Sequence, residues 1–414
     1  MKYTTLKEKV KKKFGEEFKE KFALITHYIT TGNEKYYSEA KKYFPEGFKI
    51  ENFNWDWQVP FLPDNDKFTF VDLFAGIGGM RLAFQKLGGE CVFSSEWDKF
   101  AQLTYEKNYG EFPFGDITDI DEKRVPNHEI LLAGFPCQAF SIAGERAGFE
   151  DTRGTLFFDT ARIIKEKKPK AFLLENVKGL MNHDGGTTLD TILKVLKNDL
   201  NYYVPEPEII NAKNFGVPQN RPRVFIVGFR KDLQVKEFDY PDKEEEPGTF
   251  VEVMEEDRVS NKYYLSNVYL NTLKEHKERH RKKGNGFGYE VVYNKEEGID
   301  RIANTIVTGG MGRERNLVKD NKIDEEGNRE PVTNIKGKIN EENIRRMTPR
   351  EWARLQGYPD KFDLSEVSDT QAYKQLGNSV AVPAVKAVGK KVVNKVLDKT
   401  YKSKEEDSYK VEAS

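Results

Sequence analysis

The segment GFPCQ contains Cys137, one of only two cysteines in the 414 residues. A thiolate is a nucleophile, so this residue could attack a substrate covalently. Glu175 begins the later segment ENV and carries a carboxylate. Short apolar runs at 130–133 and 171–174 predict strands that end just before these segments, and adjacent strand ends would bring thiol and carboxylate to one edge of a sheet. The ordinary alternatives are a small buried hydrophobe for Cys137 and a solvated or capping carboxylate for Glu175.

Two arginines, Arg221 and Arg223, lie in the segment QNRPR, just before an apolar run at 224–227. Residues two apart on extended backbone point the same way. The arginines therefore either face one site together or form a surface pair that bridges to acidic side chains.

A glycine-bearing turn, FAGIGG, follows the apolar run at 68–73. Glycines there allow a tight turn and a close backbone approach to a ligand. Glu96 could accept hydrogen bonds from ribose hydroxyls, Trp97 could stack on adenine, and Asp116 could hold the adenine amino group. These residues fit a nicotinamide dinucleotide or an adenosyl cofactor, and the turn alone also fits a simple strand-to-helix connection.

The elements that position these segments alternate between short apolar runs and helical patterns. This alternation is typical of an α/β fold, a doubly wound and largely parallel sheet with helices on both faces. The strands are predicted at residues 68–73, 91–95, 130–133, 171–174, 208–211 and 224–227, and two of the helices at 80–87 and 380–397.

Changes in composition along the chain divide it into five parts. Leu6, Val10, Phe14, Phe18 and Phe22 recur at helical spacing near the N-terminus, whereas the sheet pattern stops after residue 230. The predicted parts are a helical extension (1–66), the first part of a cofactor-binding domain (67–230), a smaller and mostly β or irregular domain (231–345), a return into the first domain (346–400) and a charged tail (401–414).

The composition sets limits on the class of protein. The apolar fraction is 37%, the charged fraction is 33% and the formal net charge is −1, which indicates a globular protein without a global basic signal for nucleic acid. Two cysteines exclude a disulfide framework in practice, and the sequence shows neither a signal peptide nor an apolar run of membrane-spanning length. We therefore expect a cytoplasmic protein that is not bound to a membrane and holds no metal.

Six segments occur in a fixed order: FAGIGG, GFPCQ, ENV, QNRPR, TPREWARLQGYP and QLGNSV. In this order the chain closely resembles the DNA cytosine-5 methyltransferase family, from about residue 68 to about residue 397. The resemblance implies a Rossmann-like domain that binds S-adenosylmethionine, with a smaller target recognition domain at 231–345. It implies methyl transfer to carbon 5 of a cytosine that is flipped out of duplex DNA.

The resemblance also assigns roles to the residues that match the family motifs. Cys137 matches the nucleophile that adds to C6, Glu175 the acid at N3 and the exocyclic amine, and Arg221 and Arg223 the arginines that steady the flipped base. The matched cofactor positions are Phe74, Gly76, Ile77, Gly78, Glu96, Trp97, Asp116, Ile117, Pro136, Leu156, Asn378, Ser379 and Val380. The matched DNA-binding positions are Gln138, Ser141, Thr305, Arg313 and Arg315.

The target recognition segment contains GNGFGYE and TGGMGRERNLV. It looks most like bacterial type II modification enzymes that methylate the inner cytosine of CCGG, and this implies protection from a cognate restriction endonuclease and a monomeric enzyme. Arg313 and Arg315 could read guanine in the major groove or contact phosphate. The basic run at 274–283 predicts a solvated helix that touches phosphate.

Three alternatives remain at this point. A branch of the same family methylates transfer RNA, although a long recognition segment favours duplex DNA. A catalytically inactive DNA-binding protein would not need Cys137, Glu175 and both arginines. An NAD oxidoreductase would use the glycine turn but leaves the cysteine and the arginines unexplained. The extension at 1–66 either packs on the catalytic domain or adds DNA contacts.

Overall fold

The structure is a computed structural model that describes residues 1–64, 66–136, 156–242, 246–284, 286, 288–308, 314–323 and 337–397. Four of the predicted site residues lie outside these ranges: Cys137, Gln138, Ser141 and Arg313. Within the described ranges, no helix has both the length and the apolar character needed to cross a membrane.

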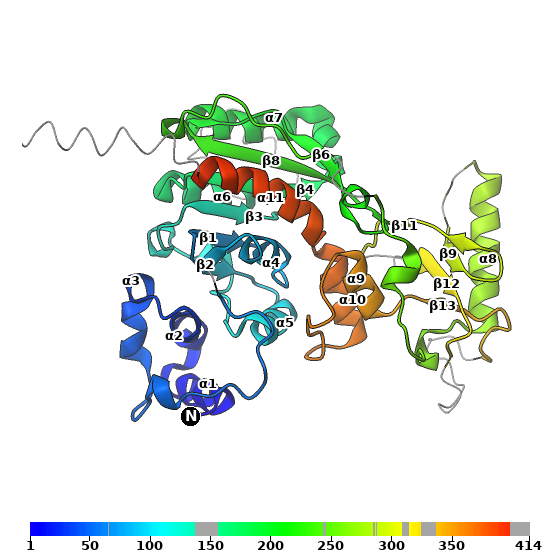
Figure 1. Cartoon of the computed structure of the whole chain (residues 1–414), viewed down its shortest axis with the longest axis horizontal. Helices are drawn as coiled ribbons and strands as arrows, with labels where there is room; N and C mark the ends of the chain where they lie inside the picture. Colours follow the sequence, from blue (N-terminus) through cyan, green and yellow to red (C-terminus); the bar gives the residue numbers. More distant parts are fainter. Residues whose placement is uncertain are drawn as a thin grey trace, which may run out of the picture.

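A central sheet, seven-stranded in the described part of the chain, organises the larger part of the molecule (Figure 1). The strands follow the order β2-β1-β3-β4-β8-β5, and β6 also pairs with β8. Their bounds are β1 Phe68–Leu73, β2 Gly89–Ser95, β3 Ile130–Ala133, β4 Ala171–Val177, β5 Tyr202–Tyr203, β6 Glu208–Asn211 and β8 Pro222–Arg230. The prediction for β3 agrees with the structure at both ends.

The first four strands are parallel, as predicted, but β8 runs antiparallel to its neighbours β4, β5 and β6. The reason is the connection that precedes it. A short 3-10 turn at Ala212–Phe215 and the two-residue strand β7 (Gln219–Asn220) join β6 to β8 without a crossover helix. A parallel pair needs a long crossover, so this short connection reverses the chain.

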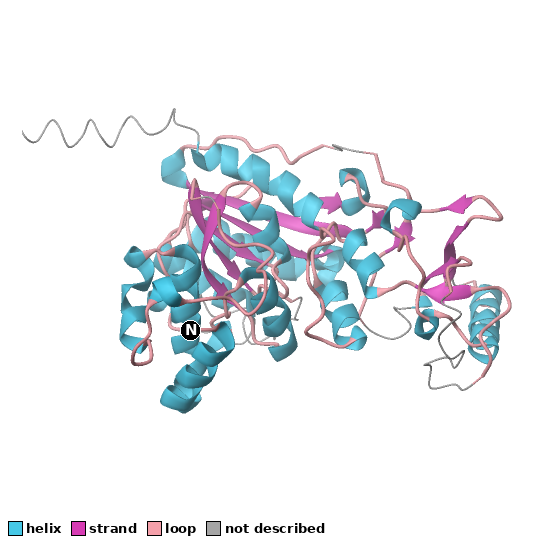
Figure 2. Cartoon of the chain, turned by 60° about the horizontal axis from the view of Figure 1, so that its bottom comes forward, coloured by secondary structure: helices cyan, strands magenta, loops and turns pink. Residues whose placement is uncertain are grey.

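Helices cover both faces of the sheet, as Figure 2 shows. Side chains alternate along each strand, so Phe70 and Val71 of β1 belong to different core clusters. The cluster of Phe70 includes α4 (Gly79–Gln85) and α11 (Val382–Leu397), whereas that of Val71 includes α6 (Leu156–Lys167) and α7 (Thr187–Lys194). The predicted two-sided α/β architecture is therefore confirmed.

The N-terminal extension packs on the edge of this sheet. Its helices are α1 Tyr3–Phe14, α2 Phe18–Thr31 and α3 Glu34–Tyr37, and Leu6, Val10 and Phe22 are fully buried as their helical spacing predicts. The Tyr37 hydroxyl donates to the Val92 carbonyl on the edge strand β2. The following irregular segment is also packed, because the Trp57 indole donates to the Lys107 carbonyl of α5 (Lys99–Tyr109) at 2.8 Å.

A second sheet lies at the other end of the molecule, to the right in Figure 1, with the order β10-β9-β12-β13 in the described residues. Helix α8 (Asn267–Lys282), which contains most of the predicted basic helix, packs against this sheet through Leu270 and Leu273. The strands are β9 Glu290–Asn294, β10 Ile299–Asp300, β12 Asn316–Lys319 and β13 Ile344–Arg346. Helices α9 (Pro349–Leu355) and α10 (Asp369–Asn378) lie between the two sheets.

Candidate active site

The ends of β3 and β4 lie side by side, as the sequence predicts. The strands are parallel neighbours with Ala133 opposite Leu174, so Gly134, which follows the end of β3, lies beside Glu175 of β4. A Cβ atom on Gly134 would lie 3.7 Å from the Glu175 carboxylate. The chain that leads toward Cys137 therefore starts next to this carboxylate.

Asn176 fixes the backbone at this edge, a role that the sequence interpretation missed. Its side-chain amide donates to the Phe135 carbonyl at 2.9 Å, and its own oxygen accepts from the Val177 backbone at 2.8 Å. The side chain is 3% exposed, so these bonds form in a dry environment. The available signal was the position of Asn176 in the segment ENV, directly after Glu175.

Glu175 forms an ion pair with Arg223 across strands β4 and β8. The Arg223 Nε and Glu175 Oε1 atoms are 3.1 Å apart, and the Glu175 side chain is almost fully buried. Burial raises the pKa of Glu175 above its ordinary value, while Arg223 and then Arg221 oppose the rise. The site thus holds a carboxyl group that stays protonated to higher pH than an exposed one.

Arg221 has a different environment from Arg223. It is buried, and its guanidinium donates to the carbonyls of Ile306 and Gly377, both at 3.0 Å, and of Ser379. The expectation that both arginines point the same way assumed continuous extended backbone. Arg221 instead lies between β7 and β8, where the strand is interrupted. Burial, and then the nearby Arg223, lower the pKa of Arg221.

Arg221 lies where three distant segments meet. Gln219 donates to the Leu355 carbonyl at 2.9 Å and accepts from the Ile306 amide at 3.2 Å. Gly377 permits a close approach, because a Cβ atom there would be 3.0 Å from the Thr308 nitrogen. The segments around Arg221, Ile306 and Gly377 therefore pack as one unit.

The glycine turn has the backbone conformation that its sequence predicts. Gly76 and Gly78 have φ values of 57° and 83°, in the left-handed region that favours glycine, and Phe74 also has a positive φ of 56°. The Gly76 amide donates to Glu96 Oε2 at 2.7 Å. A Cβ atom on Gly79 would lie 2.5 Å from the Tyr358 hydroxyl, so the turn also meets the C-terminal segments.

Glu96 and Trp97 follow β2 and differ sharply in exposure. Glu96 is 7% exposed and burial raises its pKa, whereas the Trp97 indole is 71% exposed. The exposed indole beside the buried carboxylate leaves an aromatic face on which a planar ligand could stack. Asp116 is half-buried, and its carboxylate accepts from the Thr118 amide at 3.0 Å.

The remaining predicted cofactor residues lie at the ends of elements around the same edge. Leu156 begins α6, Asn378 ends α10, and Ser379 is bonded to the Tyr358 hydroxyl at 2.6 Å. Ile77, Ile117 and Val380 are buried, while Pro136 and Asn378 are exposed.

The two described DNA-binding candidates differ from each other. The Thr305 hydroxyl donates to the Asn220 carbonyl at 2.6 Å, so it has a bond within the protein. Arg315 is exposed, and its backbone carbonyl accepts from Glu290 at the start of β9. Arg315 therefore presents a charged side chain at the surface, directly before β12.

Comparison with known proteins gives independent evidence on the family of this chain. A family model described as C-5 cytosine-specific DNA methylase matches residues 68–394. The chain is 62% identical over 333 residues to the type II methyltransferase M.HpaII of Haemophilus parainfluenzae, covering 80% of this chain and 90% of that protein. It is 40% identical to M.HhaI of Haemophilus parahaemolyticus, covering 80% and 96% of the two chains.

Solved structures support the fold. A crystal structure of a Spodoptera frugiperda DNMT2 mutant matches with a TM-score of 0.58, covering 80% of this chain and 100% of that one, at 21% identity. At this identity the likeness bears on the fold alone.

Proposed function

Since the chain belongs to the family of C-5 cytosine-specific DNA methylases, we propose that it methylates the inner cytosine of CCGG in duplex DNA. Such methylation would protect these sites from a cognate restriction endonuclease. The 62% identity to M.HpaII carries this proposal. The segments GNGFGYE and TGGMGRERNLV support the target, because they look most like those of CCGG modification enzymes. We take the enzyme to act as a monomer, as the family resemblance implies.

S-adenosylmethionine is the methyl donor, and it supplies an electrophilic methyl group when bound. The residues at the sheet edge fit its adenosine part. Both Glu96 oxygens already accept a backbone amide, from Gly76 and from Asp98, but a carboxylate has further lone pairs for ribose hydroxyls. The exposed face of Trp97 can then stack on adenine.

Cys137 is the proposed nucleophile, and its attack on C6 of the flipped cytosine makes C5 reactive toward the methyl group. Glu175 is placed in this proposal at N3 and the exocyclic amine, where its proton neutralises charge that develops on the ring. Its raised pKa suits that task, and Arg223 fixes its orientation. After methyl transfer, loss of the C5 proton allows the thiolate to leave, and water is a sufficient base.

Arg221 is proposed here as a positioning residue and not as a contact to the base. Its donors already bind the carbonyls of Ile306, Gly377 and Ser379. Loss of these bonds would leave buried carbonyls without partners and separate segments that meet at the site. In the same way, the hydrogen bond from Thr305 to the Asn220 carbonyl supports a structural role for that threonine. Among the predicted DNA-binding residues that the structure describes, Arg315 then remains the candidate for DNA contact.

Methylation mapped base by base tests the proposed target. The protein is incubated with S-adenosylmethionine and unmethylated plasmid, with a parallel tube that contains transfer RNA. We expect 5-methylcytosine only at the second C of CCGG, because duplex readout in the second sheet restricts which cytosine reaches the site. Methylation of another short site would overturn the target but keep the chemistry, and transfer to the RNA alone would overturn both.

A further inference from the structure

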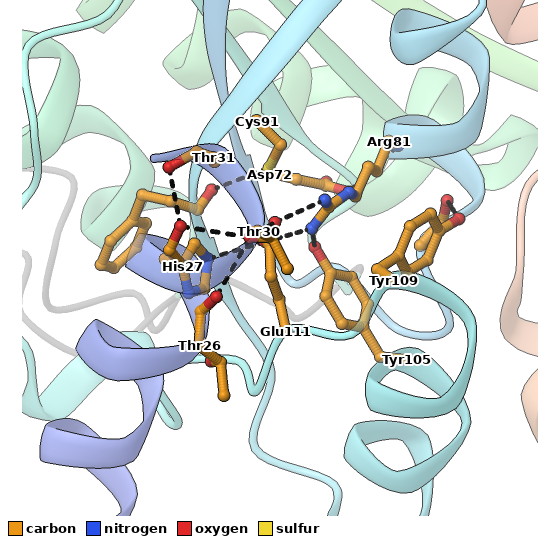
Figure 3. A network of polar contacts seen from close by, with 12 residues as sticks. Thr26, His27, Thr30, Thr31, Asp72, Arg81, Cys91, Tyr105, Tyr109 and Glu111 are labelled. Carbon is orange, nitrogen blue, oxygen red and sulfur yellow. Dashed lines mark hydrogen bonds and ion pairs between the residues drawn. The ribbon is translucent and has the colours of Figure 1, made fainter. Parts of the chain in front are cut away.

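A buried polar network joins the N-terminal extension to the catalytic domain, as Figure 3 shows. At its centre is Glu111, which is fully buried and follows α5. Glu111 forms an ion pair with Arg81 of α4, whose Nη2 lies 2.9 Å from Glu111 Oε1. From α2 of the extension, the Thr30 hydroxyl donates to the same oxygen at 2.7 Å, and His27 Nε2 lies 3.0 Å from Oε2.

The His27 ring lies between the Ala23 carbonyl and the Glu111 carboxylate. Its Nδ1 atom is 2.9 Å from the Ala23 carbonyl, which can only accept, so Nδ1 carries a hydrogen. Its Nε2 atom faces a carboxylate, which also accepts, and His27 is completely buried. Burial lowers the pKa of His27, and the neighbouring Glu111 carboxylate opposes this fall. The 3.0 Å approach of Nε2 to Oε2 places the imidazole ring of the extension directly against Glu111.

Arg81 connects this network to the glycine turn. Its backbone amide donates to Asp72 at 3.1 Å, and its guanidinium donates to the Tyr105 hydroxyl at 2.7 Å. The guanidinium also lies over the Tyr109 ring, 4.4 Å from its centre. The Tyr109 hydroxyl in turn donates to the Gly78 carbonyl at 2.7 Å, within the turn itself.

We propose that His27 and Thr30 are positioning residues for the cofactor turn, acting through Glu111, Arg81 and Tyr109. The inference rests on the proposed function, which places S-adenosylmethionine at this turn. The family match begins at residue 68, so His27 and Thr30 lie outside the shared catalytic region, whereas Glu111, Arg81 and Tyr109 lie inside it. The extension therefore contributes to cofactor affinity in addition to covering the edge of β2.

The test compares three variants of the full chain: His27→Leu, His27→Gln and Val10→Ala. Leucine removes both polar contacts of His27, whereas the glutamine amide can still donate to Glu111. Val10→Ala is the matched control, because Val10 is fully buried in the aromatic cluster of the extension and has no contact with Glu111 in the hydrogen bonds and ion pairs described. The measurements are the Kd for S-adenosylhomocysteine by calorimetry, and kcat and the two KM values on a CCGG duplex.

His27→Leu is expected to raise the Kd for S-adenosylhomocysteine and the KM for S-adenosylmethionine about ten-fold, with kcat and the KM for DNA unchanged. His27→Gln should recover most of this loss, and Val10→Ala should show none of it. Folded His27→Leu protein with wild-type affinity would overturn the proposal, as would an equal loss in Val10→Ala.

Thr30→Val provides a second test of the proposal if the His27→Leu protein does not fold. This variant removes only the hydroxyl bond to Glu111, and it should weaken S-adenosylhomocysteine binding in the same direction by a smaller factor. Unchanged binding by Thr30→Val would then overturn the proposal. Failure of the wild-type protein to bind S-adenosylhomocysteine would instead refute the proposed function, and this inference with it.

Discussion

Replacement of Cys137 by serine is expected to abolish methylation while the protein stays folded and binds S-adenosylhomocysteine. A serine hydroxyl is not ionised near neutral pH, so it cannot replace a thiolate in the attack on C6. Loss of a catalytic nucleophile lowers kcat by roughly 10⁴-fold to 10⁶-fold in other enzymes. The measurement is transfer of radiolabelled methyl groups to a CCGG duplex.

The other cysteine provides the control. Cys91 lies in β2, is fully buried, and its pKa is raised by burial to about 12, so its thiol is not available for attack. Cys91→Ala should therefore keep its methylation activity, apart from the effects of a small cavity on stability. Substantial methylation by pure Cys137→Ser protein would show that another group is the nucleophile.

Replacement of Glu175 by glutamine is expected to lower kcat by about 10²-fold to 10⁴-fold, the usual contribution of a positioned acid or base. The amide preserves the shape of the side chain and can donate a hydrogen bond, but it has no acidic proton to transfer when charge develops on the ring. Arg223 loses its ion-pair partner in this variant, so the fold should be checked by circular dichroism and S-adenosylhomocysteine binding.

The pH dependence gives a second readout of the same residue. Burial raises the pKa of Glu175, so the protonated form persists to higher pH in the folded protein and is lost as the pH rises through the raised value. Wild-type kcat should therefore fall on the alkaline side of that pKa, and Glu175→Gln should lack this limb.

Glu90 offers a matched control for Glu175, since it is also 8% exposed and its pKa is also raised by burial. Glu90 accepts from Asn33 at the edge of the sheet, away from the ends of β3 and β4. Glu90→Gln should keep the wild-type pH profile. A Glu175→Gln enzyme with wild-type kcat would remove Glu175 from the reaction.

The sequence predicts the sheet edge well because the strands there are short, apolar and bounded by polar residues. The run at 130–133 coincides with β3, and the parallel pairing with β4 brings Gly134 next to Glu175 as expected. The direction of β8 was not predictable from its apolar pattern, because periodicity says nothing about direction. The short connection through β7 decides it.

Long-range polar partners are the part that sequence reasoning could not supply. Arg221 and Arg223 look equivalent in QNRPR, yet one binds three carbonyls from distant segments and the other pairs with Glu175. Similarly, nothing in the sequence pattern of α2 pairs His27 with Glu111. Partners of this kind depend on tertiary packing, which local periodicity does not encode.

A duplex with 5-fluorocytosine at the inner position of CCGG tests covalent attack by Cys137 most directly. Fluorine at C5 cannot leave as a proton does, so after methyl transfer the thiolate stays bonded to C6. With S-adenosylmethionine present, we expect an adduct that survives denaturation, and mass spectrometry of its peptides should find the nucleotide on Cys137. An enzyme that methylates the normal duplex but forms no adduct, or forms one at another residue, would contradict nucleophilic catalysis by Cys137.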